Sequence, residues 1–251
     1  MNPRIVSIKK ENKRYTLKFL VDNEFVDYRI TEELLIEMKF LSAKEISASE
    51  YNLFLSKLPL DSLYYDAIKY TSKHLKSKKE VRDYLFNQTS SSKLIDEVLE
   101  RLEKQGIIDD YSYFKTLLDY LINTKMEGRL KIEKKLADLG LNYSFNYPIT
   151  SLKTNIKNLS TKYDIKNRDL PIKRRIEKCK IYLYQKGYSE NDISEYFSLS
   201  FFKKTGEEHL LDKEIEKAKE KAPNDINKIK FILLKKGYSL KDIEEKISEL
   251  S

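Results

Sequence analysis

The first thirty residues alternate between apolar and polar side chains, which is the period of a strand with one buried face. Four apolar residues two positions apart share one face, and these are Tyr15, Leu17, Phe19 and Val21. Asp22 and Asn23 follow as turn residues, and the alternation resumes over residues 26–30. The pattern predicts a small antiparallel sheet within residues 3–30.

Helix signals follow this predicted sheet. Thr31 precedes two glutamates in the manner of a helix N-cap, and Ser47 with Glu50 three residues later has the spacing of a capping box. We expect Pro59 to end this first part of the chain, because proline lacks the amide hydrogen that a helix interior needs. The sequence therefore predicts an N-terminal β-sheet plus helices over residues 1–60.

From residue 61 onward the apolar period is helical, and the chain repeats itself. Residues 180–198 and 230–248 align without a gap, with 10 of 19 positions identical. The motif that they share is K-G-Y-S-x-x-D-I. Its glycine can take the left-handed conformation that ends a helix, its serine and aspartate can cap the next helix, and its tyrosine can pack on the isoleucine. The motif predicts a corner between two helices.

Weaker forms of this corner occur earlier in the chain. Residues 85–95 have Thr89 at the glycine position, and residues 132–140 are followed by 142–148, which departs from the pattern and suggests an irregular or shortened third helix. Counting the corners gives four units of about 45 residues each. We place the units at residues 61–108, 109–155, 156–200 and 201–251.

Three short helices are too few to bury their own apolar faces, so neighbouring units must stack on one another. The fold that the sequence predicts is therefore mainly α. It is an elongated tandem array of three-helix repeats, preceded by a small N-terminal domain of antiparallel β-sheet and helix.

Two stretches of the chain resemble the RecX regulators of the bacterial recombinase RecA. Residues 102–114 are similar to the family's L-x-x-x-G-x-[IL]-D-D-x-x-[YF] junction, and residues 125–140 resemble its K-x-x-G-x-x-x-I-x-x-x-L-x-x-x-G segment. Residues 79–85 and the turn at 22–24 also look like the longer versions of the family. The resemblance covers nearly the whole chain.

The resemblance implies a regulator without catalysis or a cofactor of its own. Such a protein binds the RecA filament on DNA, lies along its helical groove, and inhibits strand exchange, ATP hydrolysis and co-protease activity. It thereby modulates homologous recombination, DNA repair and the SOS response. One alternative is a protein that binds single-stranded nucleic acid directly and without sequence preference. A third hypothesis is that the protein is an enzyme.

The distribution of charge points to candidate contact residues. Lys and Arg number 48 against 40 Asp and Glu, a net charge of +8, and residues 111–168 alone hold 11 Lys and Arg against 5 Asp and Glu. Three lysines of this segment, Lys131, Lys134 and Lys135, fall within about 100° of arc on a helix. An apolar stripe of Ile132, Leu136 and Leu139 marks another face of the same helix.

We expect the lysine face to meet phosphates of filament-bound DNA or acidic groups of the recombinase, since neutralised phosphates release counterions. An ordinary hydrated helix face is the equal alternative, because charged residues make up 35% of the chain. The full set of candidate contacts to the filament or to phosphates is Arg129, Lys131, Lys134, Lys135, Arg174 and Arg175.

The remaining composition argues against several classes of function. A single cysteine cannot form an internal disulfide, and two histidines cannot easily build a metal site. Neither G-x-G-x-x-G nor G-x-x-x-x-G-K-[ST] occurs, so no phosphate-cradling loop is visible. No run of eighteen apolar residues and no apolar signal segment occurs, so we expect a cytoplasmic protein outside the membrane.

The other residues with reactive side chains have structural explanations. Cys179 shares a helical face with apolar residues, so we expect a buried, unreactive thiol. Asp109 and Asp110 precede a helix, where carboxylates serve as caps. The aromatic and apolar stripe within residues 113–121 has the spacing of core packing. The sequence predicts neither a catalytic nor a metal site.

Overall fold

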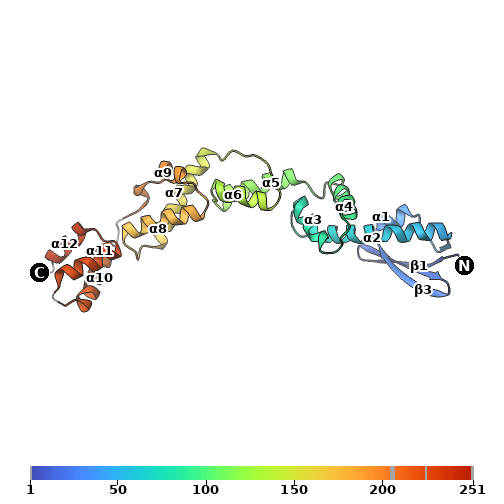
Figure 1. Ribbon diagram of the computed structural model, residues 1–251, viewed down its shortest axis with the longest axis horizontal. Coiled ribbons are helices and arrows are strands. Elements are labelled where there is room, and N and C mark those ends of the chain that lie inside the picture. Colours follow the sequence, from blue (N-terminus) through green and yellow to red (C-terminus); the bar gives the residue numbers. More distant parts are fainter. Residues whose placement is uncertain (1, 204–206, 224, 250–251) are drawn as a thin grey trace. The chain divides into compact units, whose positions relative to one another are not determined.

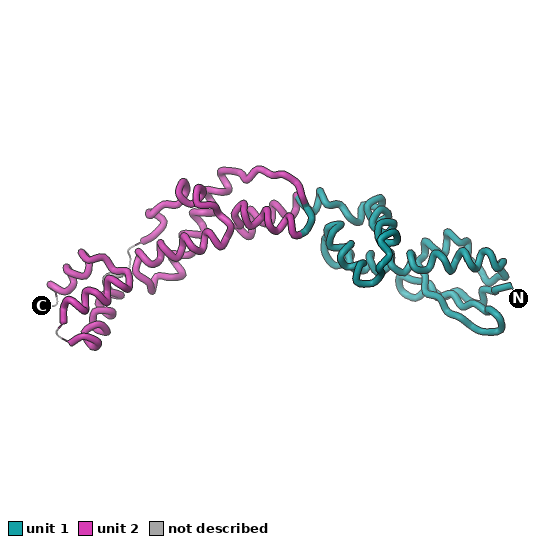
Figure 2. The backbone as a smooth tube through the Cα atoms, viewed as in Figure 1, with its two compact units in different colours: residues 1–114, 139–141 teal, residues 115–138, 142–251 magenta. Residues whose placement is uncertain are grey.

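The computed structural model describes residues 2–203, 207–223 and 225–249. These residues form twelve α-helices, a π-helical turn, a 3-10 turn and a four-stranded sheet (Figure 1). The predicted mainly helical fold with an N-terminal antiparallel sheet is confirmed. Two compact units result (Figure 2): residues 1–114 with 139–141, and residues 115–138 with 142–251.

The sheet forms as the alternation predicts. Its strands β1 (Arg4–Glu11), β2 (Arg14–Val21) and β3 (Glu24–Ile30) pair antiparallel in chain order. The short strand β4 (Lys44–Glu45) adds to β1, so the order is β3-β2-β1-β4. One face of the sheet covers a core made of Ile5, Leu17, Phe19, Ile30, Leu34, Leu35, Phe40, Ile46 and Phe54.

Side-chain caps start the next two helices at the predicted places. The Thr31 side chain accepts a hydrogen bond from the Leu34 amide at the start of α1 (Glu32–Glu37). Ser47 and Glu50 form the complete capping box of α2 (Ala48–Thr71). These helices therefore begin where a local sequence signal satisfies their first amides.

Helix α2 runs without a break through Pro59, so the expectation that this proline ends the first part of the chain is wrong. A proline removes one helical hydrogen bond, but packing on both sides of it holds this helix together. Phe54 lies in the core beneath the sheet, whereas Leu63 and Tyr64 lie in the next core along the chain. The predicted boundary at residues 60 and 61 therefore falls inside a helix.

The second half of α2 packs with α3 (Lys78–Phe86) and α4 (Ser92–Lys104), which completes the first three-helix group. The core of this group consists of Leu63, Tyr64, Ala67, Val81, Leu85, Ile95, Val98, Leu99, Leu102 and Ile108. Ser77 and Glu80 form a further capping box at the start of α3.

Helices and turns continue to the end of the described chain. They are α5 (Asp110–Asp119), the π-turn η1 (Tyr120–Thr124), α6 (Arg129–Asp138), α7 (Ile149–Lys166), α8 (Ile172–Gln185), α9 (Glu190–Tyr196), the 3-10 turn η2 (Leu199–Phe201), α10 (Glu207–Lys221), α11 (Ile226–Lys236) and α12 (Leu240–Glu249). Residues 142–148 are irregular, as predicted. The predicted boundaries after residues 155 and 200 fall inside α7 and η2, and the division into four units stays a prediction.

The repeated corner has the predicted geometry. Gly187 and Gly237 have φ values of 91° and 103°, in the left-handed region. At both corners the glycine amide donates to the carbonyl three residues back, at 2.9 Å, and the following tyrosine amide donates to the carbonyl five residues back, at 3.2 Å. Ser189 and Ser239 each accept a hydrogen bond from the amide three residues on. The same pair of backbone bonds recurs at Gly106.

Candidate interaction surface

The basic face that the sequence predicts lies on α6. Ile132 and Leu136 are buried on one side of this helix, and Lys131, Lys134 and Lys135 are exposed on the other. Neither Lys134 nor Lys135 forms an ion pair with any residue that the structure describes. Two of the three lysines therefore offer their full charge to a partner.

Ion pairs reduce the charge that the rest of α6 offers. Lys131 Nζ lies 3.3 Å from Glu127 Oε1, and Arg129 Nη1 lies 3.5 Å from Glu133 Oε1. The Arg129 guanidinium also lies 5.3 Å from the centre of the Phe145 ring. The Arg129 pair is exposed on both sides and is worth about 0.2–1 kcal/mol, so a binding partner can compete for this cation. The pair of Lys131 is different, because the Glu127 carboxylate is buried.

The start of α6 is joined to the corner that follows α8. The Gly128 amide donates to the Lys186 carbonyl at 2.8 Å, and the Leu130 amide donates to the Gly187 carbonyl at 3.1 Å. A Cβ on Gly128 would collide with the Gly187 backbone, and a Cβ on Gly187 would collide with Lys131. The first amides of one helix thus satisfy the last carbonyls of another, at a distance that only glycine permits.

Two buried tyrosines hold the segment before α6 in place. Tyr188 Oη donates to the Met126 carbonyl at 3.0 Å, and Tyr147 Oη donates to the Glu127 carbonyl at 2.9 Å. Asn155 Nδ2 donates to Tyr147 Oη at 3.1 Å. Burial raises the pKa of both tyrosines above the ordinary value. The hydroxyls therefore stay protonated and keep their hydrogen bonds to the backbone.

The contact between a corner glycine and a basic residue recurs along the chain. Gly140 lies against Lys79 near the start of α3, Gly187 lies against Lys131 of α6, and Gly237 lies against Arg174 of α8. In each case the basic residue belongs to the first turns of a preceding helix, and the glycine follows the end of a later one. The same kind of glycine contact therefore occurs three times among the described residues.

Arg174, one of the predicted contact residues, takes part in the last of these junctions. Its Nη2 donates to the Lys235 carbonyl at 2.8 Å, and its Nη1 lies 3.4 Å from Glu177 Oε2. A cation beside the last carbonyls of a helix stabilises the helix dipole. The side chain is 45% exposed, so Arg174 keeps part of its surface for a partner.

The neighbouring Arg175 contradicts the prediction, because it is buried with only 1% of its surface exposed. Its guanidinium pairs with the Asp164 carboxylate, which is equally buried, and donates to the Lys203 carbonyl at 3.1 Å. Arg175 lies four and eight residues before Cys179 and Leu183, which are fully buried. This spacing places Arg175 on the core face of α8, away from any phosphate.

Sequence analysis missed a second basic surface, on α7. Four lysines of this helix are exposed, namely Lys153, Lys157, Lys162 and Lys166. The only acidic residue of the helix, Asp164, is buried in its pair with Arg175. Counting charge helix by helix, with buried positions removed, would have found this surface within the basic segment 111–168.

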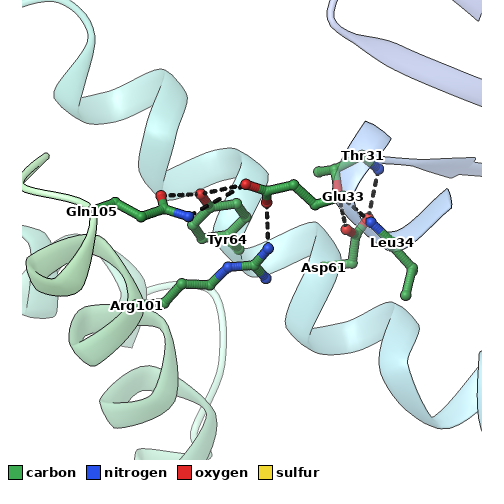
Figure 3. A network of polar contacts seen from close by, with 7 residues as sticks. All are labelled: Thr31, Glu33, Leu34, Asp61, Tyr64, Arg101 and Gln105. Carbon is green, nitrogen blue, oxygen red and sulfur yellow. Dashed lines mark hydrogen bonds and ion pairs between the residues drawn. The ribbon is translucent and has the colours of Figure 1, made fainter. Parts of the chain in front are cut away.

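In unit 1 a polar network joins α1, α2 and α4 (Figure 3). Asp61 of α2 is only 4% exposed and accepts a hydrogen bond from the Thr31 amide at 3.0 Å, together with a short one from the Thr31 hydroxyl. Burial raises the pKa of this carboxyl, and the bonds from Thr31 oppose the rise. The carboxylate fixes the start of α1 on α2.

The same network continues to α4. The Arg101 guanidinium pairs with Glu33 and lies 3.9 Å from the centre of the Tyr64 ring, and the Tyr64 hydroxyl donates to Gln105. Glu33 belongs to α1, Tyr64 to α2 and Arg101 to α4, and Gln105 is the C-cap of α4. The network therefore has a structural role, since its groups bond to one another.

The reactive side chains singled out in the sequence are structural as well. Cys179 is fully buried, and burial raises the pKa of its thiol to about 11. Asp109 Oδ1 accepts a hydrogen bond from the Ser112 amide at 3.0 Å, which confirms its role as a cap. Asp110 instead accepts from the Lys78 amide at 2.7 Å, so it caps α3 and not its own helix.

Within residues 2–203, 207–223 and 225–249, no three histidine, cysteine or acidic side chains come together as metal ligands would. Over the same residues, every helix is too short or too polar to pass through a lipid bilayer.

Comparison with known proteins supports the resemblance seen in the sequence. No family model matches the chain. Regulatory protein RecX of Oceanobacillus iheyensis is 28% identical over 201 residues, which are 76% of this chain and 73% of that protein. Regulatory protein RecX of Listeria welshimeri is 26% identical over 226 residues, which are 86% of this chain and 82% of that protein.

A crystal structure of a regulatory protein RecX has the same fold, with a TM-score of 0.56 and 20% identity over 76% of this chain and 97% of the other. The helices and the fold that the two proteins share define the class, which is a helical repeat protein. Within that class, the relatives that the chain resembles over most of its length are proteins named regulatory protein RecX.

Proposed function

We propose that this protein binds the RecA nucleoprotein filament and inhibits its recombinase, ATPase and co-protease activities. DNA repair and the SOS response would be modulated through that inhibition, in the cytoplasm. The observation that carries the proposal is the likeness to proteins named regulatory protein RecX over as much as 86% of this chain.

The repeated junction supports a partner that is itself repetitive. The corners at Gly187 and Gly237 have the same backbone bonds at an interval of 50 residues. We expect repeats joined by such corners to present equivalent surfaces. A filament of identical subunits presents equivalent surfaces too. Linking two weak contacts in this way raises avidity by about a hundredfold to ten-thousandfold when the geometry fits.

The protein acts by binding in this proposal, without chemistry of its own. Its one thiol is buried with a raised pKa. The acidic residues at the start of α5 are engaged as helix caps. The candidate contacts to the filament are the exposed cations of α6 and the exposed part of Arg174.

Cosedimentation with RecA filaments assembled on single-stranded DNA tests this proposal. Replacing Lys131, Lys134 and Lys135 together by glutamine should weaken binding about tenfold. The matched control replaces Lys217, Lys219 and Lys221 of α10, which removes the same charge elsewhere and should leave binding nearly unchanged. Equal loss of binding in both variants would mean that the α6 face contributes only net charge. The proposal would be contradicted if the unaltered protein failed to cosediment with the filaments.

Direct binding of single-stranded nucleic acid is the second candidate function. The observation that favours it is the α7 surface, where the exposed charged residues are all lysines.

A further inference from the structure

An open groove lies between α7 and the segment of α9 and η2, with a volume of about 480 Å³. Helix α7 packs against both of these elements within unit 2. The groove is lined by Lys153, Thr154, Lys157, Glu195, Tyr196 and Phe201. It therefore combines cations, a hydroxyl and two aromatic rings in one place, outside the surface predicted from the sequence.

The two lysines of the groove stand one helical turn apart. Lys153 and Lys157 are about 6 Å apart along the helix axis and on the same side of α7. Both are exposed, and neither forms an ion pair with a described residue. A chain of phosphates following the groove can meet both ammonium groups, and Thr154 between them can donate a hydrogen bond.

The aromatic rings form the opposite wall. Lys153 Nζ lies over the Tyr196 ring, 5.3 Å from its centre, so movement of this lysine onto a phosphate uncovers a face of the ring. Phe201 makes an edge-to-face contact with Phe197, with ring centres 6.3 Å apart. Both Tyr196 and Phe201 are partly exposed. A flat base can therefore stack on a ring while its phosphate lies on the lysines.

The charge of the groove selects an anion. Four exposed lysines follow α7, and the acid of that helix is buried. Glu195 is the one carboxylate among the groove residues, and it opposes an anionic ligand.

We infer that this groove binds a single-stranded nucleic acid, with Lys153 and Lys157 on successive phosphates and Tyr196 stacked on a base. An acidic protein segment would satisfy the lysines but would leave the rings unused. A duplex keeps its bases inside and offers only its phosphates. Base stacking on aromatic side chains beside a basic track is the usual means of binding single strands. The inference rests on the second candidate function and gives that function a site.

The test is the fluorescence anisotropy of labelled oligonucleotides titrated with the full chain in the absence of RecA. The probes are oligo(dT), oligo(U), a DNA duplex and polyglutamate. We expect the single strands to bind more tightly than the duplex and polyglutamate, and the ratio of the two single strands tells DNA from RNA. Preference for the duplex or for polyglutamate would overturn the inference.

Charge variants locate the site. At about 50 mM salt, the double variant Lys153→Gln, Lys157→Gln should bind oligo(dT) about tenfold more weakly, and its logarithmic salt slope should fall by about 1.4, the share of two phosphates. The matched control is Lys217→Gln, Lys221→Gln on α10, two exposed lysines one helical turn apart, which removes the same charge and should change affinity less than twofold. Equal weakening in the two doubles would show attraction by net charge alone and would overturn the inference.

Two single variants keep the test independent of folding defects. Tyr196→Leu should weaken single-strand binding about fivefold or more without changing the salt slope, because it removes a stack and no charge. Glu195→Gln should strengthen binding about twofold. A gain of affinity cannot arise from misfolding, so an unchanged or reduced affinity in this variant contradicts the inference. RecA is absent throughout, so failure here leaves the filament proposal standing.

Discussion

Helices α6 and α7 are consecutive in unit 2 and both carry lysines, yet they offer their charge in different ways. On α6 two of the four cations at the predicted site are paired with Glu127 and Glu133, and the helix start is locked into a glycine junction. On α7 the single acid is withdrawn into the core by Arg175, which leaves four exposed lysines. Availability of charge therefore depends on where the acids go, as well as on how many cations a segment holds.

The largest effect should come from the buried pair that makes this difference. Arg175→Gln leaves the Asp164 carboxylate buried without its cation, and we expect a loss of about 3–5 kcal/mol in the free energy of unfolding, measured by urea denaturation. The control is Arg174→Gln at the adjacent, half-exposed residue, which should cost about 1 kcal/mol. Similar losses at the two positions would mean that the pair is not a structural anchor of α7.

The glycine junction that fixes α6 should come next. Gly187→Ala combines a left-handed backbone with a collision against Lys131, so we expect a loss of about 3 kcal/mol. Gly106→Ala has a left-handed backbone at φ 66° but no atom within 4 Å of the new Cβ, and it should lose only about 1 kcal/mol. The difference between the two losses in the free energy of unfolding measures the contribution of the contact between Gly187 and Lys131. Equal losses would mean that this contact does not stabilise the protein.

The thiol behind α7 predicts a pH effect. Burial raises the Cys179 pKa to about 11 from an ordinary value of 9.0, so folding favours the protonated thiol. This contribution to stability is fully present below about pH 9 and is lost as the pH rises through about 11. At about pH 8 a disulfide reagent should react with the folded protein about a hundredfold more slowly than with the urea-unfolded chain. Comparable rates would show that the α7 and α8 packing opens readily.

The smallest effect should come from releasing a paired cation on α6. Glu133→Gln frees Arg129 from its 3.5 Å pair, and filament cosedimentation should strengthen about twofold. Glu216→Gln, which releases Lys219 on α10, is the matched control and should have no effect. A loss of binding in Glu133→Gln would mean that the partner meets the acids of α6 and not its cations.

Local signals were enough to predict the sheet, the helix starts and the repeated corners. Gly187 and Ser189 specify their corner within a few residues, and the Ser47 capping box is complete in the sequence itself. The position of Pro59 inside a helix and the burial of Arg175 were not predictable in this way, because both depend on packing partners elsewhere in the chain. Asp110 likewise caps a helix 32 residues away.

For the candidate interaction surfaces too, some features follow from the local sequence and others depend on tertiary packing. The exposed face of α6 follows from its apolar stripe, whereas the bare charge of α7 depends on the burial of Asp164. The elongated shape of the array stays a prediction. A compact domain of 251 residues would have a radius of gyration near about 18 Å, and solution scattering should give a clearly larger value. A value at the compact figure would contradict the predicted array.

The most direct test of the central claim follows ATP hydrolysis by RecA on single-stranded DNA while the purified protein is added in amounts below one molecule per RecA subunit. Binding along a filament predicts that hydrolysis falls steeply at these amounts. Hydrolysis that stays unchanged up to equal amounts of the two proteins would contradict regulation of RecA by this chain.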